Sequence, residues 1–469
     1  MPGYISTRGA APRLNFADAA LTGLARDGGL YVPDVCPQIS DEELRNMAGQ
    51  NYLEIAWRVI SPFVGEDISA QDLILLLQKS YKNFAHPEKT PLRKLDDGFY
   101  VQELFHGPTL AFKDVALQFL GQVFDFILKA RGQKVTIVGA TSGDTGSAAI
   151  EAFKNSPYAN IVILHPKGRV SDVQRRQMST VDAPNVRNIA IEGSFDDCQD
   201  LVKAMFGDLA FRDSMQLSAI NSINWARILA QVVYYVYTGV RVRAETGKAP
   251  TFCVPTGNFG NVYAGYVAKS MGLPVEKLIV ATNANDILHR FYTTGRMERR
   301  GVVPTISPSM DIQISSNFER LLFDLYGRDG AAVAATMKHF RDAGPFDLSA
   351  DIMARLSSVF ASGRKDDAET TAIIRDFYRR YDYVVDPHTA VGLGVAEDWK
   401  RAHPDAVMVT LATAHPAKFP DAVKAATDVA PELPPHMADL MAREERYDVL
   451  PADLAKVQDY IRAAFGGVA

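Results

Sequence analysis

The sequence predicts an α/β protein in which parallel sheets are covered by helices. From about residue 100 onward, short runs rich in β-branched residues alternate with longer segments of helical period. The expected strands are residues 135–138, 161–164, 252–254, 278–280 and 407–410. This alternation is typical of parallel sheets with helices on their faces. Ligands in such folds bind beyond the carboxyl ends of the strands, so the loops after these runs are where a functional site is expected.

Composition excludes several classes of protein. The chain has 469 residues, of which 47% are hydrophobic, which corresponds to about three globular domains and argues against disorder or a fibrous repeat. Its formal net charge is −5, so no basic excess is available to neutralise a nucleic-acid backbone. Cys36, Cys198 and Cys253 are odd in number and far apart. They fit neither a disulfide framework nor a zinc site, and they favour a reducing compartment.

Neither a secretory signal nor a membrane span is expected. Residues 1–16 lack an apolar stretch of about seven residues. A mitochondrial presequence is disfavoured because Asp18 and Asp27 interrupt the acid-poor pattern that it would need. The longest apolar run, residues 228–240, is shorter than the roughly 18 residues of a span and is better explained as a buried helix. The expected location is therefore the cytoplasm.

The first 95 residues are expected to form an accessory or oligomerisation domain. They contain helical patterns at 41–47 and 70–81 but no cluster of catalytic residue types. A second segment, about 317–383, is charged and helix-rich, and we expect it to be an insertion outside the central sheets. No internal repeat suggests a solenoid.

Lys113 is the first candidate for chemistry. It lies near the start of a predicted helix whose apolar face includes Phe112 and Phe119. Partial desolvation beside that face would lower the pKa of the amine, and an amine held partly neutral can form a Schiff base. The alternative is an exposed first-turn lysine paired with Asp114 or a nearby acid, and for an isolated lysine this alternative is favoured.

Two strand exits resemble anion-binding loops. Residues 139–149 combine glycines, hydroxyls and a helix start, which together suit an oxyanion. A tight turn with capping residues explains this loop equally well when it is taken alone. Residues 255–265 contain two Gly-Asn pairs that can present a run of backbone amides. The first loop has the spacing of neither a P-loop nor a dinucleotide fingerprint, and the second contains no Lys or Arg. Two such loops in one chain favour anion binding.

A further loop, residues 411–419, carries the hydroxyl of Thr413 and contains Pro416. Alone it is weak evidence. Together with a Schiff-base lysine, a phosphate cradle and a second anion loop, and without a metal-ligand cluster, it predicts a pyridoxal phosphate site.

Taken together, these motifs resemble those of the threonine synthase family. Its members are pyridoxal-phosphate enzymes of the tryptophan-synthase-β-like fold (fold type II). The resemblance runs along the chain and is closest to the longer subgroup of the family. The segments that carry it are residues 4–9, 27–33, 105–114, 140–146, 192–199, 221–227, 255–261 and 412–416.

The resemblance implies two lobes with parallel or mixed sheets and the cofactor between them. Residues 96–120 and 235–430 would form the larger, cofactor-binding lobe, and residues 121–234 the smaller, substrate-side lobe. Residues 1–95 would be an appended domain, and residues 431–469 a C-terminal helical tail.

The resemblance also implies roles for individual residues. Lys113 would bind pyridoxal 5'-phosphate covalently. The cofactor phosphate would be wrapped by Gly257, Asn258, Phe259, Gly260 and Asn261, and Thr413 would approach the pyridine nitrogen. The substrate carboxylate would be surrounded by Thr141, Ser142, Asp144 and Thr145. A distal phosphate would be held by Ser222, Asn224 and Arg227, with Lys167, Arg169 and Arg175 as rivals. Arg227 could instead form a structural ion pair.

The implied reaction converts O-phospho-L-homoserine and water to L-threonine and phosphate. The expected partners are this small molecule and, at most, a second copy of the chain, as a monomer or homodimer, without nucleic acid or membrane. Three alternatives stay open: a threonine or serine dehydratase of the same fold, a non-catalytic homologue that binds a ligand, and a nucleotide-dependent enzyme that uses the two glycine loops.

Overall fold

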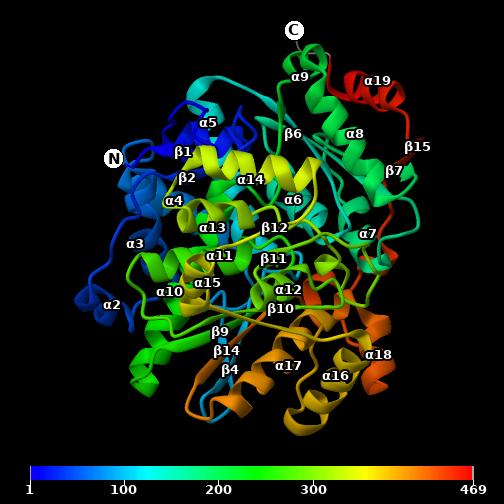
Figure 1. Cartoon of the computed structure of the whole chain (residues 1–469). Coiled ribbons are helices and arrows are strands. Elements are labelled where there is room, and N and C mark those ends of the chain that lie inside the picture. Colours follow the sequence, from blue (N-terminus) through cyan, green and yellow to red (C-terminus); the bar gives the residue numbers. More distant parts are fainter. Residues whose placement is uncertain (1, 467–469) are drawn as a thin grey trace.

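Two open sheets organise the molecule. A computed structural model describes residues 2–466. The larger sheet has the strand order β13-β10-β9-β14-β4-β3 and the smaller sheet the order β15-β7-β6-β5-β8. Neighbouring strands in both sheets are parallel except for the antiparallel pair β3 and β4. In Figure 1 the larger sheet occupies the lower half and the smaller sheet the upper right. The predicted α/β class is confirmed.

The strands of the larger sheet are β3 (Leu92–Asp96), β4 (Phe99–Glu103), β9 (Pro250–Pro255), β10 (Leu278–Thr282), β13 (Phe360–Arg364) and β14 (Val407–Ala412). All residues of β9 and β14 are buried, as expected for strands that carry helices on both faces. Helices α16 (Asp367–Tyr381), α17 (Pro387–Ala402) and α18 (Pro420–Thr427) cover the lower face in Figure 1, and α11 (Gly260–Ser270) and α12 (Ile287–Thr294) lie above it.

The strands of the smaller sheet are β5 (Val135–Ala140), β6 (Ala159–Pro166), β7 (Val186–Glu192), β8 (Leu217–Ser218) and β15 (Asp448–Pro451). Alternate residues face opposite sides. Val162 and Leu164 pack with α8 (Phe195–Gly207), α9 (Leu209–Ser214) and α19 (Leu454–Phe465). Ile161 and Ile163 belong to the main core with α5 (Lys113–Arg131) and α6 (Asp144–Phe153). Helix α7 (Asp172–Ser179) packs against α6.

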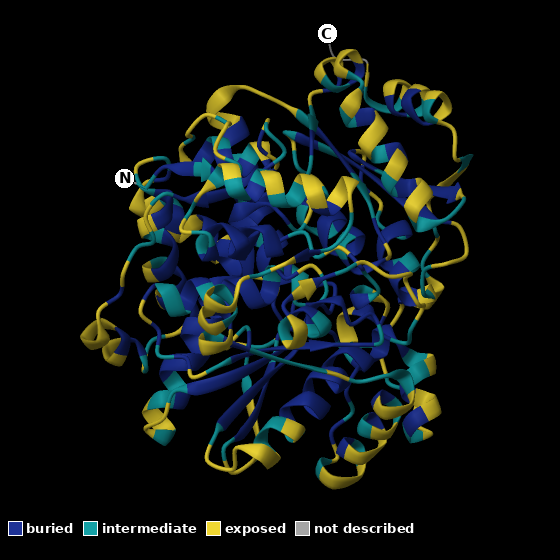
Figure 2. Cartoon of the chain, viewed as in Figure 1, coloured by how far each residue is buried: buried dark blue, intermediate teal, exposed yellow. Residues whose placement is uncertain are grey.

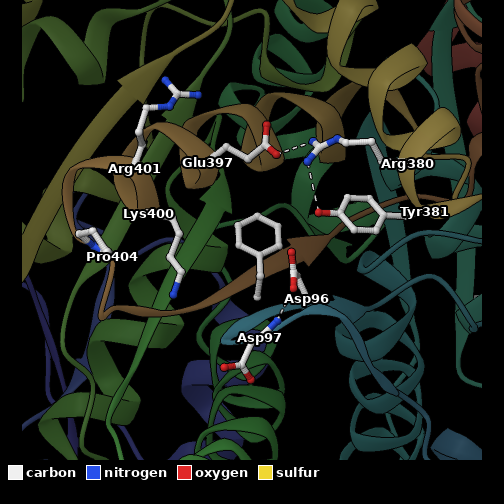
Figure 3. Close-up of a pocket in the computed structure, with 9 residues that line it drawn as sticks. Asp96, Asp97, Arg380, Tyr381, Glu397, Lys400, Arg401 and Pro404 are labelled. Atoms are coloured by element: carbon white, nitrogen blue, oxygen red, sulfur yellow. Dashed lines mark hydrogen bonds and ion pairs between the residues drawn. The ribbon is translucent and has the colours of Figure 1, made fainter.

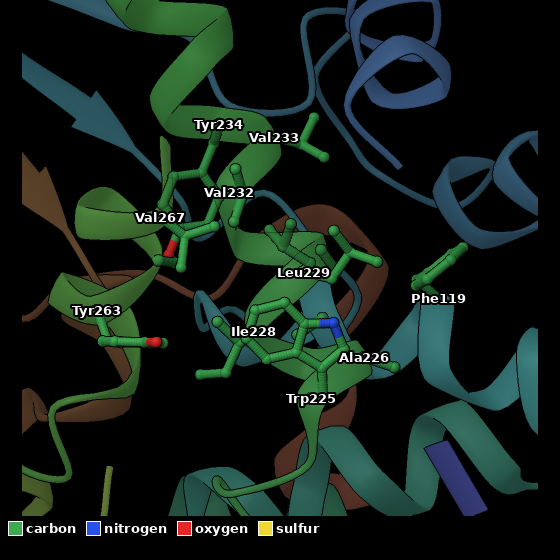
Figure 4. Packing of buried hydrophobic residues seen from close by; sticks show 14 of the residues in the cluster. Phe119, Trp225, Ala226, Ile228, Leu229, Val232, Val233, Tyr234, Tyr263 and Val267 are labelled. Atoms are coloured by element: carbon green, nitrogen blue, oxygen red, sulfur yellow. The ribbon is translucent and has the colours of Figure 1, made fainter. Parts of the chain in front are cut away.

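Helix α10 (Trp225–Thr246) is the centre of the main core. Asn224 caps its first turn, and Gly247 ends it in the left-handed conformation. The helix packs against α3 (Tyr52–Val64), α5 and α11, and its dark colour in Figure 2 shows how completely it is buried. Figure 4 shows Trp225, Ile228 and Tyr234 among its neighbours. The apolar run at 228–240 is thus a core helix, and among the described residues no helix has the length and apolarity to cross a membrane.

The N-terminal segment packs directly onto helices α5 and α10. It contains a two-stranded antiparallel sheet of β1 (Tyr4–Ser6) and β2 (Tyr31–Pro33), together with α1 (Phe16–Thr22), α2 (Asp41–Met47), α3 and α4 (Ala70–Tyr81). Helix α4 packs on α5, and Arg8 forms an ion pair with Glu319 at 2.9 Å. The core of this segment is continuous with that of α10. The expected boundaries at 120/121 and 234/235 fall inside α5 and α10.

Two segments expected to be helical also contribute strands. The region 317–383 contains α13 (Phe318–Leu325), α14 (Gly330–Asp342), α15 (Ala350–Val359) and α16, but also β12 (Phe346–Asp347), which pairs with β11 (Arg296–Met297), and β13 at the edge of the larger sheet. The C-terminal tail contains β15, which pairs with β7, before α19. Strand β13 has no β-branched residue and β15 has only four residues, so neither segment has a sequence pattern typical of a strand.

Candidate active site

One cavity lies where the loops after the strands of the larger sheet meet the starts of five helices, α5, α6, α10, α11 and α17. It brings together most of the residues that the sequence analysis singled out: Lys113, Asp144, Thr145, Ser222, Arg227, Gly257, Asn258, Phe259, Gly260, Asn261 and Thr413. Residues that were not singled out also line it, namely Phe112, Gln231, Pro255, Thr256, Ser309, Met310, His388 and Ala414. Thr141, Ser142 and Asn224 are not among the lining residues.

A second hollow lies at the opposite end of the larger sheet. It is lined by Asp96, Phe99, Arg380 and Lys400, among others (Figure 3). Phe99 begins β4, so this hollow is at the amino ends of the strands. Arg380 contacts the Glu397 carboxylate, and Lys400 donates to the carbonyl of Ala406 at 2.6 Å. These groups are already paired, and ligands in open α/β folds bind at the other edge of the sheet.

Lys113 is the first residue of α5, and its side chain is only 12% exposed. Its Nζ lies 3.1 Å from Oδ2 of Asp144 and 4.8 Å from the centre of the Phe112 ring. Burial lowers the pKa of Lys113 below the ordinary lysine value, although the Asp144 carboxylate acts in the opposite direction. The alternative of an exposed lysine is therefore wrong, and the acid that pairs with Lys113 is Asp144 from another helix and not Asp114.

Asp114 instead holds the loop in front of Lys113. Its carboxylate accepts hydrogen bonds from the backbone N–H of Thr109 at 2.8 Å and from the Thr109 hydroxyl at 2.6 Å. Burial raises the pKa of Asp114 to about 6. A Cβ on Gly107 would lie 2.4 Å from the Cβ of Asp114, so the glycine in this motif makes room for the carboxylate.

Asp144 is the first residue of α6 and receives four donors. Oδ2 faces Lys113 and the hydroxyl of Ser309, and Oδ1 faces Nε2 of Gln174 at 2.8 Å and Nζ of Lys418 at 2.9 Å. Burial alone would raise the pKa of Asp144, but the charges of Lys113 and Lys418 outweigh it and hold the pKa well below its usual range. Asp144 is thus an ionised, buried carboxylate.

The second glycine loop forms a cradle at the start of α11. A Cβ on Gly257 would lie 2.9 Å from the carbonyl oxygen of Ser309, so the two backbones pass too close for a side chain. Phe259 has φ +64°, the left-handed region, and has no side-chain cap. The first N–H groups of α11 are therefore not capped by that side chain and are available to an anion. Oδ1 of Asn261 accepts from two tyrosines, whereas its buried Nδ2 has no partner.

Arg227 is a buried cation with unused hydrogen-bonding capacity. Arg227 is only 3% exposed, and its Nη1 donates a hydrogen bond to the carbonyl of Ile220 at 2.9 Å. Its buried Nε has no hydrogen-bond partner within residues 2–466. Burial lowers the pKa of Arg227 to about 10, so it remains charged at neutral pH. No carboxylate pairs with Arg227 among the described residues, which argues against the structural ion pair.

The three rival cations lie outside the cavity lining. Lys167 pairs with Glu192 at 3.0 Å, and Arg175 pairs with Glu445 at 2.8 Å. Arg169 is exposed.

Some predicted site residues have structural duties. The hydroxyl of Thr141 accepts from the N–H groups of Gly143 and Gly146 and so holds the turn into α6. Asn224 caps α10 with Oδ1 and donates from Nδ2 to the carbonyl of Ala20 at 2.7 Å. In both cases the side chain is committed to the backbone.

His388 was missed because it lies next to the helix-rich segment without a recognisable motif. Its Nδ1 lies 2.8 Å from Oδ2 of the buried Asp386, and its Nε2 accepts from the backbone N–H of Ser309 at 3.1 Å. An accepting Nε2 requires the hydrogen on Nδ1, so the Asp386 contact fixes this tautomer. His388 therefore holds the Ser309 loop over the cavity.

The residues present fit pyridoxal phosphate. The cradle offers uncapped helix N–H groups and the unpartnered Nδ2 of Asn261 to a phosphate, and Lys113 offers a buried amine to an aldehyde. Thr413 lines the same cavity; its backbone carbonyl accepts from Phe112 N–H at 2.8 Å, which ties it to the residue before Lys113.

Comparison with known proteins agrees with this geometry. The model of the family described as pyridoxal-phosphate dependent enzyme matches residues 84–344. Fold and cavity thus define a pyridoxal-phosphate-dependent enzyme, with pyridoxal 5'-phosphate as cofactor.

The models for threonine synthase N terminus and threonine synthase, C-terminal, match residues 3–81 and 389–461. Threonine synthase of Pseudomonas aeruginosa is 52% identical over 98% of this chain and 97% of its own length. The crystal structure of pyridoxal-phosphate-bound threonine synthase from Brucella melitensis superposes with a TM-score of 0.96 at 52% identity, covering 99% of this chain and 100% of that one. The yeast enzyme gives 0.94 at 39%, covering 99% of each chain. The chain belongs to the threonine synthase family.

Proposed function

We propose that the protein converts O-phospho-L-homoserine and water to L-threonine and phosphate. The observation that carries the substrate assignment is Arg227. A buried arginine with an unpartnered Nε beside the cofactor cradle is costly in the free protein, and an anionic group of the ligand would offset that cost. Family membership and full-length similarity to threonine synthases support the same activity.

In this proposal the cofactor phosphate lies against Gly257, Asn258, Phe259, Gly260 and Asn261, and Thr413 faces the ring. Lys113 binds the cofactor covalently. When bound, pyridoxal phosphate supplies an electrophilic carbonyl carbon and a conjugated ring that withdraws electrons from bonds at the substrate Cα.

The substrate is held at its two charged ends. Ser222 and Arg227 bind the distal phosphate. The guanidinium charge attracts the phosphate strongly because Arg227 is buried. Thr145, with the backbone of the loop that contains Ser142, lies where the α-carboxylate is expected. Thr141 and Asn224 contribute by holding the loop and the start of α10 in place. Asp144 cannot attract a carboxylate because it is itself ionised, and so it acts on cations and N–H groups.

Lys113 is the group that moves protons. Burial lowers the pKa of Lys113 and so favours its neutral amine relative to an exposed lysine, and a neutral amine at this position can accept a proton from the substrate Cα and return protons later in the reaction. Phe112 and Met310 line the cavity next to it and limit the access of bulk water. Arg227 stabilises the phosphate as it leaves Cγ.

A dehydratase of the same fold is the second candidate, since it would share Lys113 and the cradle. It needs no distal phosphate site, so Arg227 favours the proposed reaction. The test is to incubate the holoenzyme with O-phospho-L-homoserine and to measure phosphate and threonine by independent assays. Equimolar formation of both is expected. Production of 2-oxobutyrate without threonine would overturn the proposal, and full activity in Lys113→Ala would overturn the role of the lysine.

We also propose that the reaction takes place in the cytoplasm. Cys36, Cys198 and Cys253 are all free thiols, which is consistent with a reducing compartment.

A further inference from the structure

Lys418 is a buried lysine that the sequence analysis did not single out. It ends the short 3-10 helix after β14, Pro416–Lys418, and its side chain is 0% exposed. Nζ lies 2.9 Å from Oδ1 of Asp144 and donates to the carbonyl of Thr109 at 2.8 Å. A buried ammonium is tolerated only when it is paired and hydrogen-bonded. Asp144 is the paired anion that makes this position possible.

The two oxygens of Asp144 have separate partners. Oδ2 faces Lys113 and Ser309, whereas Oδ1 faces Lys418 and Gln174. When an amine condenses with an aldehyde, the C–N double bond replaces C=O, and two hydrogens of the amine leave with the oxygen as water. Once Lys113 has reacted in this way, it no longer presents a free ammonium to Oδ2. The contacts on Oδ1 do not depend on Lys113.

We infer that Lys418 is a positioning residue that keeps the Asp144 carboxylate ionised and in place while Lys113 is covalently engaged. The ammonium of Lys418 balances the charge of Asp144 from the side away from the cavity. Oδ2 is then left as a fixed hydrogen-bond acceptor that faces the nitrogen of Lys113 and any N–H of the ligand.

Lys418 also connects Asp144 to the segment that carries Lys113. The Thr109 carbonyl accepts from Lys418, and the Thr109 N–H and hydroxyl donate to Asp114 in the first turn of α5. The loops at the ends of β4 and β14 and the start of α6 are therefore tied to one ammonium. Loss of that ammonium would therefore disturb the positions of these loops as well as the charge balance of the site.

Three charged groups act on the nitrogen of Lys113, namely Asp144 of α6, Lys418 after β14 and Arg227 of α10. The titratable side chain of His388 of α17 lines the same cavity. Asp144 favours a protonated nitrogen, whereas Lys418 and Arg227 disfavour it. Removal of Lys418 alone therefore shifts this balance towards protonation.

The first test measures the stability of the cofactor-free protein by urea unfolding. The variants are Asp144→Asn and the double variant Asp144→Asn/Lys418→Met. Asp144→Asn leaves the Lys418 ammonium buried without an anion, so the double variant is expected to unfold at a higher urea concentration than Asp144→Asn alone. A midpoint equal to or below that of Asp144→Asn would overturn the inference. This comparison does not require the single variant Lys418→Met to fold.

The second test uses the visible absorption of the bound cofactor, titrated with pH. Its apparent pKa is expected to rise by about one unit in Lys418→Met relative to the unmodified protein, because a nearby positive charge is lost. The same rise is expected between Asp144→Asn and the double variant. Lys365→Met is the matched control, because Lys365 pairs with Asp398 outside the cavity, and it should leave the titration unchanged. An unchanged titration in both Lys418 comparisons would show that Lys418 is merely structural.

Discussion

Replacement of Arg227 by Met should stabilise the free protein and damage its activity. Burial lowers the pKa of Arg227 to about 10, well below the ordinary value for arginine. Because one pKa unit corresponds to about 1.4 kcal/mol, this burial costs about 3 kcal/mol in the folded state. The hydrogen bond to the Ile220 carbonyl returns about 1.5 kcal/mol. Arg227→Met is therefore expected to raise the free energy of unfolding by about 1 to 2 kcal/mol.

Activity should change in the opposite direction. Loss of one partner from a buried, hydrogen-bonded charge pair costs about 3 kcal/mol or more, which corresponds to a fall in kcat/KM of about a hundredfold or more. The assays are urea unfolding of the cofactor-free protein and phosphate release from O-phospho-L-homoserine by the holoenzyme. Inorganic phosphate should also raise the Tm of the unmodified holoenzyme, in which the cofactor phosphate already occupies the cradle, and leave the Tm of the Arg227→Met holoenzyme unchanged.

Arg320 provides the matched control. It is equally buried, and burial also lowers its pKa to about 10, but it donates to the carbonyls of Tyr31 and Ile223 and contacts Asn317. Arg320→Met should therefore destabilise the protein. If Arg227→Met lost stability as Arg320→Met does, and kept its kcat/KM, the assignment of Arg227 to an anionic ligand would be refuted.

Three further substitutions test other parts of the site. Gly257→Ala places a Cβ 2.9 Å from the Ser309 carbonyl oxygen and should weaken cofactor binding about tenfold, as measured by an absorbance titration. Gly49 has open space around it, so the control Gly49→Ala should leave cofactor binding unchanged. The pKa of Asp114 is raised to about 6 in the folded state, so the folded protein binds this proton more tightly than the unfolded chain, and stability falls as pH rises from about 4 to 6. Asp114→Asn should remove about 3 kcal/mol of that pH dependence in urea unfolding, and an unchanged slope would contradict the burial argument. Burial lowers the pKa of His415 to about 4, so the unfolded chain takes up the proton first, and stability is lost as pH falls from about 6.5 to 4. His415→Asn should suppress about 3 kcal/mol of this acid destabilisation, and identical acid unfolding of the two proteins would refute it.

The sequence could predict the main sheets and the convergence of the loops. Strands such as β9 and β14 are apolar throughout because both faces are covered, and such runs are recognisable without a structure. Parallel strands place their carboxyl ends at one edge, so the loops at Gly257 and Thr413 had to approach each other. The confirmed family assignment came from the motifs in those loops.

The remaining features depend on contacts between residues far apart in the chain. Lys418 and Asp144 are separated by more than 250 residues, and nothing near either one indicates the pairing. Thr141 and Asn224 are of residue types that often bind ligands. Their side-chain oxygens instead accept hydrogen bonds from backbone N–H groups of a turn and of a helix start. Local sequence does not distinguish the two uses.

The order in which the chain visits the two sheets has a mechanical consequence. It builds β3 and β4 of the larger sheet, crosses to the smaller sheet through α5, returns through α10, and crosses again after β14 to add β15. The two sheets are therefore linked by three covalent tethers, two of which are the packed helices α5 and α10. Such a linkage permits a small rocking motion about a shared axis but opposes wide separation. The third tether is exposed at residues 428–430, so a protease cut there would release one link and leave both helical links intact.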